Sequence, residues 1–185
     1  MKKYLFFILF LGSAVTTSFG QKYYSKTGHI HFLSQAPIET IESDNRNGFV
    51  VYDAATGQLE FSVLIKGFQF EKALMQQHFN ENYMESDKFP KSLFKGSILN
   101  WKMIHMDKDS LYNADVDGQM TIHGITKPFK CTAKLIVKGG MISASSAFDV
   151  VIADYGIQVP KVVRENISKT VKVVVNADLQ LMNTK

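Results

Sequence analysis

Apolar and polar residues alternate with a period of two along most of this chain, and this pattern limits the folds that it can adopt. In residues 129–138, FKCTAKLIVK, every second side chain is apolar, and the opposite face is mostly lysine and threonine. Such alternation is typical of antiparallel strands that bury one face. It predicts eight strands, near residues 27–34, 47–54, 58–67, 92–103, 111–123, 129–138, 141–153 and 171–182. Eight antiparallel strands can close into a barrel, so we expect an all-β antiparallel barrel.

Two segments interrupt this alternation with helical spacing. Residues 70–84, FEKALMQQHFNENYM, bring Leu74, Met75 and His78 onto one face. Residues 160–170 begin with Pro160, which favours the first position of a helix. We therefore expect one or two short amphipathic helices, which could cover an opening of the barrel.

The first twenty residues, MKKYLFFILFLGSAVTTSFG, have the composition of a secretory signal peptide. Lys2 and Lys3 precede an apolar run, and small residues stand at the end of the segment. The apolar run is shorter than the roughly 20 residues that a membrane-spanning helix needs. We expect residues 1–20 to be removed near Gly20, and residues 21–185 to form one domain in the periplasm or outside the cell.

The charge and the cysteine content give no support to a nucleic-acid-binding protein or to a domain stabilised by disulfides. Without Lys2 and Lys3, 19 basic residues stand against 17 acidic ones, and this small excess gives no reason to expect nucleic acid as a partner. Cys131 is the only cysteine, so an exported chain would have no internal disulfide and would depend on packing for its stability. Cys131 shares its face with Phe129 and Leu135, so we expect it to be buried and slow to react with thiol reagents.

The pattern around the histidines favours neither a metal site nor a catalytic site. His29 and His31 lie two residues apart on one face of a predicted strand, a spacing that can ligate a metal. No third ligand and no acidic residue to orient them stands nearby in the sequence, so we predict no metal site. His123 has no nucleophile or acid at a catalytic spacing, and the turn around Gly124 and Pro128 favours a structural role.

The inward faces of the strands can either fill a core or line a cavity, and the alternation does not distinguish the two. The candidate lining residues are apolar residues of the central strands: Phe61, Val63, Ile65, Trp101, Met120, Ile122, Phe129 and Leu135. We expect no catalytic residue, because the chain has no carboxylate pair in an apolar setting, no phosphate-binding glycine loop and no serine elbow.

Three stretches resemble sequence patterns of the YceI-like family, also called lipid- or polyisoprenoid-binding YceI-like proteins. They are HFNENYMESDKFPKSLFKG at residues 78–96, GQMTIHGITKPF at 118–129 and FDVVIADYGI at 148–157. The resemblance extends over nearly the whole mature chain. Two departures are Gln76, where many relatives have arginine, and Tyr155, where the late motif often has phenylalanine.

The resemblance implies an extended eight-stranded barrel, similar to lipocalins, with a long apolar interior. On that basis we expect a non-enzymatic, exported protein that binds an isoprenoid-type lipid, such as a polyisoprenoid or a quinone tail, as carrier or store. Transient membrane contact would accompany exchange of this lipid, and no other cofactor is expected. Two alternatives stay open: an exported stress or adhesion barrel with a filled core and no ligand, and a lipid-modifying enzyme that uses His123 or His78.

Overall fold

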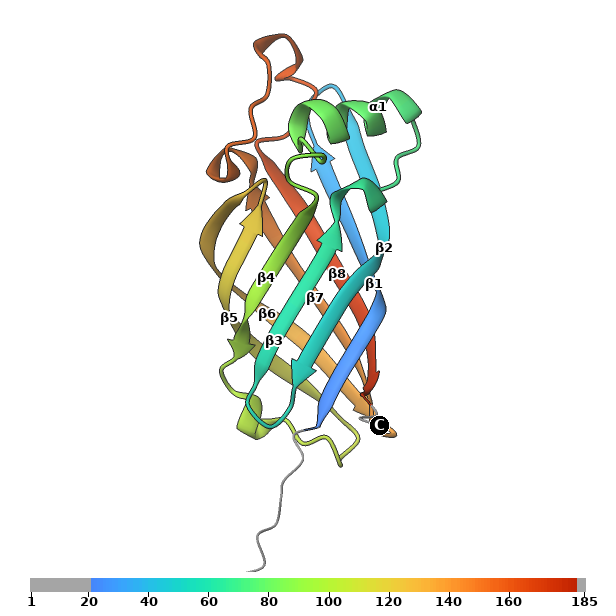
Figure 1. Ribbon diagram of the computed structural model, residues 1–185, viewed down its shortest axis with the longest axis vertical. Coiled ribbons are helices and arrows are strands. Elements are labelled where there is room, and N and C mark those ends of the chain that lie inside the picture. Colours follow the sequence, from blue (N-terminus) through green and yellow to red (C-terminus); the bar gives the residue numbers. More distant parts are fainter. Residues whose placement is uncertain (1–20, 183–185) are drawn as a thin grey trace, which may run out of the picture.

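The computed structural model describes residues 21–182, which form a closed antiparallel barrel (Figure 1). Eight strands follow one another around the barrel in chain order, and β8 pairs with β1 to close it. The strands are β1 (Lys22–Gln35), β2 (Thr40–Asp53), β3 (Gln58–Leu64), β4 (Lys91–Ile98), β5 (Ser110–Ile122), β6 (Ile125–Lys138), β7 (Met141–Val151) and β8 (Thr170–Leu181). The predicted all-β, eight-stranded antiparallel barrel is therefore confirmed.

The alternation of residue types places one face of each strand inside the barrel. In β6, Phe129, Cys131 and Ala133 face the interior, and Lys130 and Lys134 alternate with them on the outer surface. Ala133 lies opposite Ala114 of β5 and opposite Ser146 of β7. Because residues directly opposite each other share a face of the sheet, the inward faces of neighbouring strands form one continuous surface.

One short helix lies at the upper end of the barrel in Figure 1. It consists of α1 (Ala73–His78) and a π-helical turn (Phe79–Tyr83), so the helix predicted over residues 70–84 is confirmed with shorter limits. The β1–β2 turn and residues 152–169 lie at the same end, because β1 and β7 finish there. We call this the lid end.

The second predicted helix, over residues 160–170, is wrong. The structure has only a 3₁₀ turn there, Lys161–Val163. Backbone groups after this turn bond to other parts of the chain, since the Glu165 carbonyl accepts from Ile38 N–H and the Ser168 amide donates to the Ser34 hydroxyl. A helix would need these groups for itself, and a single turn makes too few hydrogen bonds to offset the cost of nucleation.

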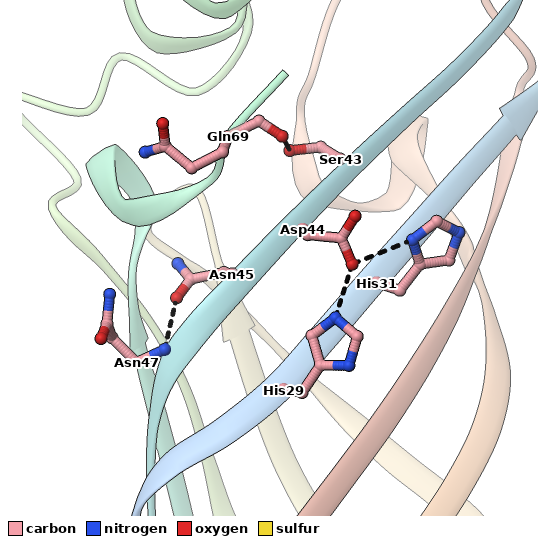
Figure 2. Close-up of polar contacts among 7 residues, drawn as sticks. All are labelled: His29, His31, Ser43, Asp44, Asn45, Asn47 and Gln69. Atoms are coloured by element: carbon pink, nitrogen blue, oxygen red, sulfur yellow. Dashed lines mark hydrogen bonds and ion pairs between the residues drawn. The ribbon is translucent and has the colours of Figure 1, made fainter. Parts of the chain in front are cut away.

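β2 begins at Thr40, well before the strand predicted at 47–54. The added part, TIESDNR at residues 40–46, is mostly polar and has low strand propensity. The Ser43 hydroxyl donates to the Gln69 carbonyl (Figure 2), and the Asn45 side-chain amide donates to the Leu64 carbonyl. Hydrogen bonds to distant residues therefore stabilise this part of the strand, and burial of an alternating apolar face contributes less to it.

Side chains pack against one another at the opposite end of the barrel. β4 ends at Ile98, before the predicted limit of residue 103, and a 3₁₀ turn (Trp101–Met103) follows. The Trp101 ring lies against Gly57 in the β2–β3 turn, where φ is +78° and any side chain would meet the ring. Ile98, Ile104 and Ala114 belong to the buried cluster against which this ring packs. We call this packed region the closed end.

Residues 21–182 include no helix of the length and apolar character needed to cross a membrane. The predicted signal peptide, residues 1–20, lies outside the described residues. The division of the chain into segments 1–20 and 21–185 therefore stays a prediction from the sequence.

Candidate ligand-binding cavity

The barrel encloses a cavity of about 530 Å³. Its wall receives side chains from all eight strands and from the lid-end helix. This volume falls within the roughly 300–1,000 Å³ that is usual for small-molecule sites. A packing defect would be far smaller, because protein interiors leave few voids larger than a water molecule. The barrel is therefore hollow rather than filled.

Seven of the eight predicted lining residues lie on the cavity wall: Phe61, Val63, Ile65, Met120, Ile122, Phe129 and Leu135. Ile65 does so from a 3₁₀ turn after β3 (Ile65–Gly67) rather than from the strand. Trp101 is the exception, because the chain leaves the barrel wall after Ile98 and the ring packs at the closed end. Contact of the seven residues with a ligand stays a prediction.

Charged groups reach the cavity only at the lid end. Among the described residues, Glu39 and Lys72 are the only Asp, Glu, Lys or Arg side chains on the wall, and Lys72 Nζ lies 3.0 Å from Glu39 Oε1. Asn166 donates a hydrogen bond to Glu39 Oε2 at 3.4 Å. The hydrogen bonds from Lys72 and Asn166 hold the pKa of Glu39 below its usual value. A long apolar molecule therefore fits the interior, with charged partners available to it only at the lid end.

Four phenylalanines pack where the lid-end helix meets the barrel. The Phe79 ring of the helix contacts Phe32, Phe68 and Phe70, with ring centroids 5.6, 5.6 and 5.0 Å apart. Such contacts contribute roughly 0.5–1.5 kcal/mol per pair beyond burial. All four rings line the cavity, so the helix is part of its wall. None of the four was among the predicted lining residues, although the density of phenylalanine in residues 68–79 is a signal for Phe68, Phe70 and Phe79.

His123 lies in the β5–β6 turn at the lid end and links two other segments there. Its Nε2 bonds to Glu85 Oε2 at 2.8 Å, and its Nδ1 bonds to the Tyr155 carbonyl at 3.1 Å. His123 and Glu85 have positive φ angles of +49° and +42°, which is uncommon for residues other than glycine. The Phe89 ring packs edge-on against the imidazole, with centroids 4.7 Å apart. These contacts support the structural role predicted for this histidine.

A polar cluster of His29, His31 and Asp44 lies on the outer face of β1 and β2 (Figure 2). Asp44 Oδ1 lies 2.5 Å from His29 Nε2 and 3.3 Å from His31 Nδ1. The hydrogen bond from His29 is the largest cause of a lowered pKa at Asp44. The expectation that no acidic residue orients these histidines is wrong, because β2 begins early enough to bring Asp44 opposite His31.

We still expect the purified protein to hold no stoichiometric metal. Both imidazoles lie against the same carboxylate oxygen, and residues 21–182 contain no group of three or more His, Cys, Asp or Glu side chains arranged to hold a metal ion. Elemental analysis tests this expectation. One zinc per chain that disappears in the His29→Ala/His31→Ala double variant would contradict it.

Cys131 is expected to react slowly with thiol reagents in the native protein. Its side chain faces the cavity and is half-buried, rather than fully buried as predicted, because it borders open space instead of packed atoms. Burial raises the pKa of its thiol, which leaves less of the reactive thiolate. Labelling followed by mass spectrometry should be slower in native than in denatured protein. Equal rates would contradict the inward orientation of Cys131.

Replacing His123 by alanine should lower the free energy of unfolding by about 2 kcal/mol, because Glu85 and the Tyr155 carbonyl lose their shared partner. Urea denaturation followed by circular dichroism measures the change. His123→Asn is the matched control for the backbone, since asparagine tolerates positive φ and isolates the loss of the hydrogen bonds. A catalytic histidine would give a different result, in which stability is unchanged and turnover of a lipid is lost.

A closed antiparallel barrel with an apolar interior and a helix in its wall belongs to the class of β-barrels that can hold one ligand inside. The sequence matches the profile of the YceI-like domain over residues 15–179. The chain therefore belongs to the YceI-like family, as the three sequence stretches indicated. A comparison with curated proteins finds no match.

Solved structures from three organisms share the fold. A polyisoprenoid binding domain from Saccharophagus degradans, implicated in plant cell wall breakdown, superposes with a TM-score of 0.76 at 10% identity, covering 88% of this chain and 99% of that one. BcnA from Burkholderia cenocepacia has a TM-score of 0.65 at 12% identity, with 82% and 95% covered. A YceI protein from Campylobacter jejuni has a TM-score of 0.55 at 13% identity, with 81% and 90% covered. At these identities the similarity concerns the fold.

Proposed function

We propose that the protein is an exported, non-enzymatic binding protein that holds an isoprenoid-type lipid inside its barrel, as a carrier or a store. The observation that carries this proposal is the apolar cavity, whose charged wall residues are confined to the lid end. A polyisoprenoid or a quinone tail is a long hydrocarbon that suits such a space. The S. degradans domain of the same fold is described as polyisoprenoid binding, which supports the same class of ligand here.

Burial of hydrocarbon supplies the binding energy. Each CH₂ group contributes about 0.8 kcal/mol relative to water. The sum for a long tail would exceed the limit of about 20 kcal/mol observed for non-covalent affinities. The relevant comparison is with a membrane, where the tail is already out of water, so the net preference for the protein is small. A small net preference allows exchange, which suits a carrier or store.

The export part of the proposal rests on residues 1–20, which combine two lysines, an apolar run and small residues before Gln21. Amino-terminal sequencing of the protein recovered from the periplasm or the medium should begin near Gln21. A protein that keeps these residues and stays in the cytoplasm would contradict export and leave the lipid-binding part of the proposal unaffected.

The cavity also bears on the two alternative functions. A stress or adhesion barrel with a filled core would not contain a space of about 530 Å³. A lipid-modifying enzyme would need a base that is free to act on the ligand. Both ring nitrogens of His123 are held, by Glu85 and by the Tyr155 carbonyl, so this histidine is not free. His78 lies on the cavity wall, but no hydrogen bond of the described residues joins it to an acidic side chain that would orient it as a base or to a nucleophile that it would activate. Lipid binding without turnover is therefore the function that these observations support best.

Organic extraction of the purified protein, followed by mass spectrometry, tests the proposal. We expect about one isoprenoid-type lipid per chain. Protein stripped of lipid should take up an added polyisoprenoid, or a quinone with an isoprenoid tail, and should return it chemically unchanged. A protein that carries no lipid and takes up neither compound would contradict the proposal, and a chemically altered lipid would favour the enzyme.

A further inference from the structure

The three most exposed apolar side chains of the lid end stand around the cavity. Val162 is 90% exposed, Ile38 67% and Leu74 62%. They come from three separate segments: the connection between β7 and β8, the β1–β2 turn, and α1. Large apolar side chains that are exposed together indicate a surface that meets another molecule or a membrane.

Polar contacts hold these three segments next to one another. The Ile38 N–H donates to the Glu165 carbonyl at 3.1 Å, which joins the β1–β2 turn to residues 160–169. Glu39 pairs with Lys72, directly before α1, at 3.0 Å. Figure 1 shows the same segments together at the upper end of the barrel. Ile38, Leu74 and Val162 therefore form one connected rim.

The rim is continuous with the cavity. Leu74 lines the cavity although most of its surface is exposed, and Val163 and Ile167 line it beside the segment that carries Val162. The cavity therefore reaches the surface at this rim. An apolar molecule could pass here between the cavity and another apolar phase without crossing water.

The segment that carries Val162 is mostly basic. Residues 160–169 carry Lys161, Arg164 and Lys169 against a single acidic residue, Glu165. Lys161 and Arg164 are exposed, and the ion pairs of the described residues include neither of them. Apolar tips flanked by unpaired basic groups complement a bilayer that has anionic head groups.

We propose that the rim formed by Ile38, Leu74 and Val162 docks on the surface of an anionic lipid bilayer. The apolar tips enter the interface, Lys161 and Arg164 contact lipid phosphates, and the open end of the cavity faces the hydrocarbon. This inference rests on the proposed function, because it supplies the route by which the lipid enters and leaves. A bilayer fits better than a protein partner because the rim leads directly into a space suited to hydrocarbon.

The closed end offers a matched control. Leu99 and Met103 are exposed to a similar degree, 62% and 69%. Neither lines the cavity, and the cluster that contains Trp101 packs beside them. Their exposed surface does not lead into the barrel, so substitutions at these residues should leave docking unchanged.

Co-sedimentation with vesicles measures docking by the full mature protein. Vesicles of phosphatidylcholine with phosphatidylglycerol should bind it, and vesicles of phosphatidylcholine alone should bind it roughly tenfold more weakly. Val162→Asp and the double variant Lys161→Gln/Arg164→Gln should each weaken binding to the anionic vesicles by roughly tenfold or more. Leu99→Asp should bind as the wild type does. Circular dichroism checks that each variant folds, which the exposure of Val162 leads us to expect.

The lipid content of the same preparations separates this inference from the proposed function. Val162→Asp protein should still contain lipid in its cavity, because the substitution is outside it. No binding by the wild type, equal binding by wild type and Val162→Asp, or an equal loss in Leu99→Asp would overturn the docking inference whatever the cavity contains. Rim-dependent vesicle binding by a protein that never carries or takes up lipid would support docking and contradict the proposed function.

Discussion

Phe61→Asp protein is expected to fold and to purify without lipid. Phe61 lies in β3 on the cavity wall and is half-buried, between Leu59 and Val63 on the same face. A carboxylate in contact with hydrocarbon would cost several kcal/mol if it stayed dry. Water can enter the cavity once the lipid is absent and hydrate the carboxylate, so the cost falls mainly on ligand binding. Circular dichroism and lipid extraction measure folding and binding separately.

Two further variants serve as controls for this result. Ala114 is 0% exposed and does not line the cavity, so Ala114→Asp should be insoluble or unfolded. Phe61→Leu keeps the wall apolar and should retain lipid. A folded Phe61→Asp protein with wild-type amounts of lipid would contradict the place of β3 in a ligand-bearing wall. An unfolded variant, together with a wild type that never carries lipid, would favour the filled barrel.

Ala133→Phe should weaken lipid binding by roughly tenfold, which corresponds to the cost of one overpacked contact. The same variant should lose little stability. Ala133 borders the cavity from β6 and is half-buried. A phenyl ring at this position enters open space, so the free energy of unfolding should change by less than about 1 kcal/mol. The same ring occupies volume that a lipid chain needs. Urea denaturation and titration with a polyisoprenoid measure the two effects.

Ala114 provides the matched control position for Ala133. It lies directly opposite Ala133 on β5 but is packed on all sides. Ala114→Phe should overpack this region and lower the free energy of unfolding by about 1–3 kcal/mol or more. If the two phenylalanine variants lost stability equally, the space next to Ala133 would not be open in solution. If Ala133→Phe bound lipid as tightly as the wild type, the lipid would not occupy that part of the barrel.

The strands of this protein could be predicted because the direction of a side chain from a strand depends on local backbone geometry. In β8, Val171, Val173 and Val175 alternate with other residues and line the cavity. The same period-two pattern identified β6 and β3, and seven of the eight residues predicted from it lie on the cavity wall. The helix over residues 70–84 was found in the same way, from a spacing that is also local.

The features that could not be predicted depend on contacts between distant segments. The first half of β2 is polar, and it is held by hydrogen bonds from Ser43 and Asn45 to residues of other segments. The position of Asp44 beside His31 follows from that early start. Trp101 continues the apolar sequence of β4, but it leaves the wall because the chain turns after Ile98. Local alternation contains no signal for any of these contacts.

The sequence by itself determined which side chains face the interior, and the tertiary structure decided that the interior is hollow. A period of two reports the direction of a side chain and not the space in front of it, so it describes a filled barrel and a hollow one equally well. Ala114 and Ala133 have the same side chain, lie opposite each other and face inward. Ala114 packs within a buried cluster and Ala133 borders the cavity, because the space in front of each depends on the side chains that meet it from across the barrel.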